Sequence, residues 1–230
     1  MGEGYCPKGV CDGSGWILDE ETSEARACEC RAIRIREGRR RLGTGIPKRF
    51  LGVGFDRKPV VDMDPGIVLH VKDFVRKIDW NLEAGKGLWF YGDVGTGKTS
   101  LAMIVSKAAI DSGRDVAVYS VPHLLADIRS TYEDGSGSTY LELFRRLANV
   151  HLLHLDDLGA EKPTEWVLEQ LYSIVNERWQ NQRSIVVTTN IDDRDELREQ
   201  VGNRTVSRLT EICGDPLPIM GRDLRVPKSA

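Results

Sequence analysis

Strands and helices alternate in the pattern of apolar and polar residues from about residue 46 onward. Short apolar runs of strand length lie at 87–91, 115–120, 150–156, 184–190 and 217–220. Helical spacing of apolar residues occurs between these runs, at 98–113, 122–132, 139–149, 164–180, 192–200 and 203–212. This alternation predicts an α/β fold, a three-layer sandwich in which a five-stranded, mostly parallel sheet carries helices on both faces.

The first 45 residues differ in composition from the rest of the 230-residue chain. They hold four of the five cysteines and no apolar run large enough to form a core. A chain of this length accommodates one ordinary domain and a small appendage. We therefore expect a cysteine-rich module with a basic linker at 1–45 and a single larger domain at 46–230.

The N-terminal cysteines are arranged as two close pairs. Cys6 and Cys11 form a C-x4-C pair, and Cys28 and Cys30 form a C-x-C pair. Two such pairs separated by a loop can supply four thiolates to a tetrahedral ion, so the spacing predicts a structural Zn²⁺ site. Free or redox-active cysteines are the alternative. Cys213 stands apart and is interpreted as a core residue at a helix end.

Charge and hydropathy exclude some classes of protein, and one local cluster of basic residues has two possible interpretations. The net charge of −3 gives no overall basic field for nucleic acid. The sequence has no apolar run of about 18 residues and no signal peptide, which predicts a cytoplasmic protein without membrane contact. Eight basic residues between 31 and 49 form either a solvated linker or an arm that contacts phosphates: Arg31, Arg34, Arg36, Arg39, Arg40, Arg41, Lys48 and Arg49.

The segment GDVGTGKTS fits the G-x-x-x-x-G-K-[ST] motif between a predicted strand and a predicted helix. Its glycines let backbone N–H groups wrap a phosphate, and the helix N-terminus adds partial positive charge. Lys98 is expected to reach the β- and γ-phosphates of ATP, and Thr99 to bind Mg²⁺. The whole loop is predicted to bind the nucleotide: Gly92, Asp93, Val94, Gly95, Thr96, Gly97, Lys98, Thr99 and Ser100.

Two adjacent carboxylates follow the apolar run HLLHL, at Asp156 and Asp157. Adjacent like charges are costly unless a cation or water compensates them. This strand and the strand before the Gly-rich loop end at the same sheet edge, where ligands bind in such folds. Asp156 is therefore expected to hold Mg²⁺, and Asp157 to act as a base or to orient water. A solvated loop start is the alternative interpretation of the pair.

Three segments in this order, GDVGTGKTS, LLHLDDLGAEKPTEW and SIVVTTN, resemble the AAA+ ATPases of the DnaC/DnaI type, the bacterial replicative helicase loaders. IstB, a transposition ATPase, is a close relative of that family. The resemblance covers about residues 46–226. It implies a P-loop AAA+ fold, and because the chain stops soon after the fifth predicted strand, no helical lid domain is expected.

The resemblance also implies roles for residues outside the two motifs. Asn190 is similar to sensor 1, which positions the attacking water. Arg208 is the choice for an arginine finger, with Arg204 the nearest competitor, and Arg225 resembles sensor 2, which contacts the γ-phosphate. For each arginine, a surface salt bridge is the alternative. Because an arginine finger acts on a neighbouring subunit, ATP binding is expected to drive homo-oligomer assembly.

Many AAA+ enzymes carry Asp-Glu where this chain carries Asp156 and Asp157. The second Asp is one methylene shorter than Glu and reaches a water molecule less easily. Members of the loader family carry the same Asp-Asp pair. We therefore expect slow ATP hydrolysis, with ATP acting as an assembly switch.

The resemblance implies that the protein loads or remodels a replicative DNA helicase on single-stranded DNA. The helices at 122–132 and 139–149 lie where loaders carry an element that contacts single-stranded DNA, and they hold Arg129, Arg145 and Arg146. Two ordinary amphipathic helices are the alternative. For the whole protein, the alternatives are an IstB-like transposition helper on duplex DNA and a non-hydrolysing, ATP-switched adaptor.

Overall fold

The computed structural model of the protein describes residues 6, 9–11, 16–18, 25–29, 45–133 and 137–224. The chain divides into two units, Met1–Gly45 and Ile46–Ala230. Among the residues described, none of the helices has the length and apolar character needed to cross a membrane.

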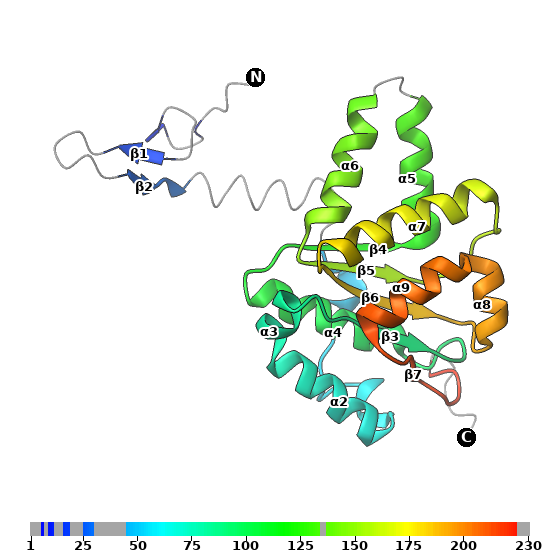
Figure 1. The fold of residues 1–230 in the computed structure, drawn as a ribbon. Coiled ribbons are helices and arrows are strands. Elements are labelled where there is room, and N and C mark those ends of the chain that lie inside the picture. The colour runs from blue at the N-terminus through cyan, green and yellow to red at the C-terminus, as the bar shows by residue number, and fades with distance from the viewer. Residues whose placement is uncertain are drawn as a thin grey trace. The chain divides into compact units, whose positions relative to one another are not determined.

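Parallel strands form the central sheet of the larger unit, in the order β4-β5-β6-β3-β7 (Figure 1). The strands are β3 (Leu88–Tyr91), β4 (Val116–Ser120), β5 (Leu152–Asp156), β6 (Ser184–Thr189) and β7 (Leu217–Pro218). Because neighbouring strands run in the same direction, their carboxyl ends meet at one edge of the sheet. The predicted α/β fold with a five-stranded parallel sheet is confirmed.

Helices cover both faces of this sheet (Figure 1). One layer contains α2 (Pro65–Arg76), α3 (Ile78–Glu83) and α4 (Lys98–Asp111). The other contains α5 (Val121–Glu133), α6 (Gly137–Asn149), α7 (Glu165–Gln180), α8 (Arg194–Val201) and α9 (Asn203–Cys213).

Alternate residues of β5 point to the two layers, as the period of a strand requires. Leu153 and Leu155 pack in the core that includes α5–α9, and Leu152 packs in the core that includes α2–α4. Residues at even positions of β5 therefore face α4, the helix that begins at the Gly-rich loop.

Residues 46–86 contain structure that the sequence analysis did not assign. Besides α2 and α3, two short 3₁₀ helices lie here, η1 (Lys48–Phe50) and η2 (Val60–Asp62). The start of α2 has a local signal, since Asp64 Oδ1 accepts a hydrogen bond from the Ile67 N–H at 3.0 Å and Pro65 is the first helical residue. Helix α6 begins at Gly137, slightly before the predicted helix at 139–149.

The N-terminal unit contains an antiparallel pair of strands, β1 (Trp16–Leu18) and β2 (Ala25–Ala27). Cys6 and Cys28 are both buried, and Cys11 and Ile17 pack against them. The apolar interior of this unit is therefore built around sulfur atoms within the residues described.

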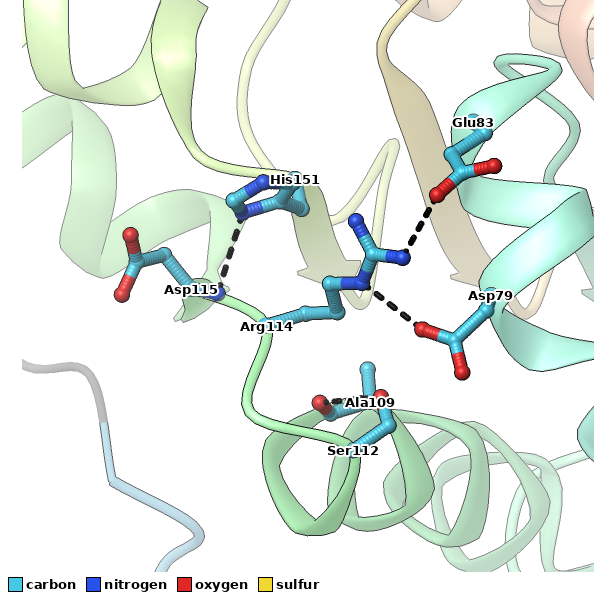
Figure 2. Close-up of polar contacts among 7 residues, drawn as sticks. All are labelled: Asp79, Glu83, Ala109, Ser112, Arg114, Asp115 and His151. Carbon is cyan, nitrogen blue, oxygen red and sulfur yellow. Dashed lines mark hydrogen bonds and ion pairs between the residues drawn. The ribbon is translucent and has the colours of Figure 1, made fainter.

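The amino edge of the sheet is held together by charged and polar contacts (Figure 2). Arg114 donates to Asp79 Oδ1 at 2.7 Å and to Glu83 Oε1 at 2.8 Å, joining the start of β4 to α3. The backbone N–H of Asp115 donates to His151 Nδ1 at 3.1 Å. These contacts connect the loops that precede β4 and β5.

Arg178 of α7 is fully buried near this same edge. Burial lowers the pKa of its guanidinium to about 9. Its guanidinium donates to backbone carbonyl oxygens at the end of α6 and beside the starts of β5 and β6: Leu147, Ala148, Val150, His151 and Ser184. Because the last carbonyls of a helix have no partner within it, this arginine completes the C-terminus of α6.

Candidate functional site

The loop between β3 and α4 adopts a conformation that requires glycine at three positions. Gly92, Gly95 and Gly97 have φ angles of 134°, 80° and 99°. Side-chain atoms also approach closely, since a Cβ on Gly97 would lie 2.1 Å from Met63 Cε. Gly97 precedes the first residue of α4, so the N-terminus of that helix, with its partial positive charge, lies at this loop. The geometry is that of an anion cradle.

Lys98 folds across the loop that precedes it. Its Nζ donates to the carbonyl oxygens of Gly92 at 2.8 Å and Asp93 at 2.6 Å, and its side chain is buried. Thr96 Oγ1 donates to the same Asp93 carbonyl at 2.9 Å. These bonds hold the loop closed around the lysine and place a positive charge beside the glycine backbone.

Asp156 is the last residue of β5 and Asp157 follows it, and both contact Thr188 of the neighbouring strand β6. Thr188 Oγ1 donates to Asp156 Oδ1 at 2.7 Å, and the N–H of Asp157 donates to Thr188 Oγ1 at 3.0 Å. Asn190 Nδ2 donates to Asp157 Oδ1 at 3.5 Å. Asp157 has a left-handed φ of 58°, so its side chain does not continue the alternation of side chains along β5. The structure therefore brings Asp156, Asp157 and Asn190 together through Thr188.

The Asp156 carboxyl is stabilised in its charged form. Burial raises its pKa, but His154 and the hydroxyls of Thr188 and Thr99 favour the carboxylate more strongly, so the net pKa lies below the ordinary value. Thr99 and Asp156, which were predicted as the Mg²⁺ ligands, are thus neighbours. A carboxylate that stays ionised beside a hydroxyl is the donor set that Mg²⁺ prefers.

A cavity of about 1440 Å³ opens over these residues. It is lined by Asp157 and Asn190, by 94–100 of the Gly-rich loop, and by parts of the segments 49–63 and 220–224. Part of its apolar wall comes from the segment 49–63: Phe50, Val53, Pro59 and Met63. These residues reach the cavity because the segment that contains η1 and η2 packs beside the loop.

The C-terminal segment is anchored on the same loop. The N–H of Leu224 donates to the Gly95 carbonyl at 3.0 Å, and a Cβ on Gly95 would lie 1.9 Å from Asp223 Oδ1. Arg222 and Leu224 line the cavity. Arg225, predicted as sensor 2, lies just outside the described residues.

The two candidates for an arginine finger lie on α9, and neither lines the cavity. The Arg208 guanidinium stacks 3.5 Å above the Trp179 ring centre and donates to Glu211 Oε1 at 2.8 Å. Trp179 Nε1 donates to the other oxygen of Glu211 at 2.9 Å. Arg204 is exposed, and its guanidinium lies 5.7 Å from the Tyr172 ring centre. Arg208 is therefore held in a defined rotamer at the surface.

Three of the four predicted zinc ligands come together in the N-terminal unit. The sulfur atoms of Cys6, Cys11 and Cys28 lie within 4.8 Å of one another, and Cys6 and Cys28 are 3.9 Å apart. Cys30 lies outside the described residues. Cys213 is distant in sequence and partly buried, and it packs against the core of the larger unit. Its thiol donates to the Ile185 carbonyl at 3.4 Å, and burial raises the pKa of the thiol.

The chain was compared with known proteins and structures. Residues 66–204 match the family model described as IstB-like ATP binding protein. The replicative helicase loader DnaC of Buchnera aphidicola subsp. Baizongia pistaciae is 26% identical over 167 residues, which are 72% of this chain and 66% of that protein. The replicative helicase loader DnaI of Bacillus subtilis is 28% identical over 198 residues, 85% of this chain and 61% of that protein.

Among solved structures, the crystal structure of the DnaC helicase loader is similar with a TM-score of 0.63 and 27% sequence identity. That match covers 76% of this chain and all of the other chain. The chain spans about two thirds of the length of the two relatives in sequence. These comparisons confirm the resemblance that the three sequence motifs indicated.

Proposed function

The chain belongs to the family of IstB-like ATP-binding proteins, and from that premise we propose that it is an ATP-dependent loader of a replicative DNA helicase. The observation that carries the proposal is the convergence of the glycine loop, Lys98, Asp157 and Asn190 on a single cavity. Two relatives that cover most of this chain bear the name replicative helicase loader. A role in DNA replication would place the protein in the cytoplasm.

The residues around the cavity fit a nucleoside triphosphate with Mg²⁺. The positive-φ glycines and Lys98 form a cradle for phosphates, and Thr99 and Asp156 would hold the metal. A bound Mg²⁺ neutralises charge that develops on the phosphates. Phe50, Val53, Pro59 and Met63 provide an apolar wall on which an adenine ring can pack.

We assign slow ATP hydrolysis to the same site. Asp157 lines the cavity and would accept a proton from the attacking water or orient it, and Asn190 would hold that carboxylate in place. The Asp157 side chain is one methylene shorter than that of Glu, so the water must approach closely. Rapid basal turnover, on the order of 10 s⁻¹, would contradict this part of the proposal.

Assembly on ATP binding is proposed from the position of the α9 arginines. Arg204 and Arg208 lie outside the cavity of their own subunit, as an arginine acting on a neighbouring subunit must. Trp179 and Glu211 restrain Arg208 at the surface, which reduces the entropy lost when it meets a phosphate. Arg225 is proposed as sensor 2, because the residues before it are anchored on Gly95.

The α5–α6 pair is proposed to contact single-stranded DNA. The exposed Tyr132 stacks on Tyr140 with ring centres 5.3 Å apart, and Arg129 and Arg145 are exposed on the same two helices. Arg129 also lies 4.7 Å from the Trp166 ring centre. Aromatic rings and arginines on one surface bind single strands by stacking and by phosphate contact. Arg146 is excluded from this role, because its terminal nitrogens are buried.

The N-terminal unit is proposed to hold structural Zn²⁺ and to bind the helicase. Thiolates at about 2.3 Å from a tetrahedral ion lie about 3.8 Å apart, and the 3.9 Å between Cys6 and Cys28 agrees with that spacing. Cys11 supplies a third sulfur atom, and Cys30 is the proposed fourth. Total-metal analysis of protein purified without added metal should find one zinc per chain; its absence would remove this part of the proposal.

The test of the loader function is a pull-down with the host's replicative helicase, with and without ATP and single-stranded DNA. We expect ATP-dependent retention of the helicase and the DNA by the wild type, and loss of that dependence in Lys98→Ala. Lys107→Ala on the same helix α4 is the matched control. Retention that does not respond to ATP or to Lys98→Ala would instead indicate a passive adaptor.

The family match favours one second candidate, an IstB-like transposition helper. Such a protein would retain duplex DNA and neither the helicase nor a single strand. The pull-down therefore includes a duplex of the same length as the single-stranded oligonucleotide. Selective retention of that duplex would replace the loader proposal with this one.

A further inference from the structure

A histidine is buried inside the sheet two residues before Asp156. His154 lies in the middle of β5 and has no exposed surface. It points toward α4, where Ser106 Oγ lies 2.9 Å from its Nδ1. On its other side, Nε2 lies 3.8 Å from Asp156 Oδ1 and has no hydrogen-bond partner. The ring thus bridges the helix of the Gly-rich loop and the candidate metal-binding carboxylate.

The surroundings of the ring decide where its hydrogen sits. A bare Nε2 would turn its lone pair toward an ionised carboxylate oxygen, which is unfavourable, so the hydrogen belongs on Nε2. Nδ1 is then an acceptor and takes the hydrogen of the Ser106 hydroxyl. Ser106 Oγ also lies 3.1 Å from the Ala102 carbonyl oxygen, so the Ser106 hydroxyl has two possible acceptors. Because the Asp156 carboxylate places the ring hydrogen on Nε2, the hydroxyl donates to His154 Nδ1.

Packing alone does not require a histidine at this position. The neighbouring residues of that face, such as Leu152, Val118 and Val186, are buried and apolar. A buried polar ring costs free energy unless its nitrogen atoms are satisfied, and a leucine or valine would fill a strand position without that cost. The geometry instead directs the one unsatisfied ring nitrogen toward the Asp156 carboxylate.

We propose that His154 is a positioning residue that orients Asp156 for Mg²⁺, and that Ser106 supports the required tautomer by donating to Nδ1. The inference rests on the proposed binding of ATP and Mg²⁺. Such outer partners of a metal ligand set its orientation and basicity. Thr188 holds the same oxygen, Asp156 Oδ1, from β6, which leaves Oδ2 free of these two contacts. His154 thereby connects α4 mechanically to the metal-binding carboxylate.

The test is a Mg²⁺ titration of the binding of a fluorescent ATP analogue to the full-length protein. In His154→Leu we expect the Mg²⁺ concentration for half-maximal binding to rise by about 10-fold or more. Analogue binding in EDTA should be unchanged, because His154 contacts Ser106 and Asp156, which lie outside the glycine cradle. A substitution that only disturbed packing would weaken analogue binding both with Mg²⁺ and in EDTA, or would weaken neither.

His151→Leu is the matched control, since it makes the same change at the residue directly before β5. His151 accepts a hydrogen bond from the Asp115 backbone N–H (Figure 2) and is not among the residues that line the cavity. Its Mg²⁺ titration should coincide with that of the wild type. His154→Gln keeps an N–H donor on a flexible chain and should recover much of the lost Mg²⁺ affinity.

Ser106→Ala provides a second route if His154→Leu fails to fold. It leaves the ring in place but removes the partner of Nδ1, so we expect a smaller shift in the same direction. Unchanged Mg²⁺ titrations in both Ser106→Ala and His154→Leu would overturn the inference and leave the proposed function intact. If the wild type does not bind the analogue at all, the proposed function itself is wrong.

Discussion

The two edges of the central sheet are made from the same kinds of residues, but they are completed in different ways. At the amino edge, Arg114 is paired with Asp79 and Glu83, and His151 accepts from a backbone N–H (Figure 2). At the carboxyl edge, Asp157 and Asn190 face a cavity of about 1440 Å³. At the amino edge the charged groups pair with one another, whereas at the carboxyl edge polar and charged groups line a cavity.

The difference shows which features identify a functional site. Charged and titratable residues occur at both edges, so residue type does not separate them. The carboxyl edge combines three further features: helix N–H groups without partners in the helix, positive-φ glycines and carboxylates that converge on one space. The amino edge lacks this convergence among the residues described, and its buried Arg178 binds only backbone carbonyl oxygens.

The largest expected effect is at the carboxyl edge, in Asp157→Asn. Asn tolerates the left-handed φ of this position, so the fold is retained. Because Asn cannot accept a proton, ATP hydrolysis should fall by about 10²–10⁴-fold while the affinity for ATP is kept. Asp192→Asn, an exposed acid that follows β6, is the control and should hydrolyse ATP at the wild-type rate. ATP hydrolysis at the wild-type rate in Asp157→Asn would show that another group accepts the proton.

At the amino edge, the largest effect should come from Arg178→Met. Removing the guanidinium leaves several buried carbonyl oxygens without donors, so the free energy of unfolding should fall by roughly 3–5 kcal/mol in urea denaturation. ATP affinity of the folded protein should not change. Arg183→Met, a partly exposed arginine after α7, serves as the comparison. Equal losses in the two variants would mean that the carbonyl contacts contribute nothing specific.

Arg114→Ala tests the exposed ion pairs of the same edge. We expect a decrease in the free energy of unfolding that is smaller than that of Arg178→Met, because solvent screens these pairs. The difference from the wild type should shrink between about 0.1 M and about 1 M salt, where the screening length becomes short. A difference that persists at high salt would point to lost packing of the arginine side chain on α3.

The smallest expected effect is a pH dependence from His151. Burial is the largest cause of its lowered pKa, so the unfolded chain takes up this proton at a higher pH than the folded protein does. Stability should therefore fall as the pH drops below about 6.5, and His151→Leu should lose this contribution. Urea denaturation of both proteins at pH 7.5 and 5.5 provides the measurement. Parallel losses in the two proteins would assign the pH dependence to other groups.

The motifs of the candidate site could be predicted because they depend on short-range geometry. Glycines at 92, 95 and 97 are required by the backbone of one tight loop, and Lys98 and Thr99 follow directly on the same helix. Asp156 and Asp157 were singled out because two adjacent carboxylates after an apolar run are costly unless a cation or water compensates them. Each of these signals lies within a few residues of sequence.

Other parts of the site depend on contacts between distant segments. Thr188 lies in an apolar strand, and only its pairing with β5 brings its hydroxyl to Asp156. His154 resembles any buried histidine until Ser106, 48 residues earlier, appears at its other nitrogen. Phe50 and Met63 reach the cavity because η1 and η2 pack beside the Gly-rich loop.

The sequence by itself determined the α/β fold, the nucleotide loop and the acidic strand end, because hydrophobic period and glycine conformation are local properties of the chain. Only the tertiary structure decided which polar groups meet across strands, that Arg146 turns inward, and that Trp179 and Glu211 restrain Arg208. These outcomes depend on how side chains far apart in sequence pack and satisfy one another. The spacing of residues along the sequence does not show which of these contacts form.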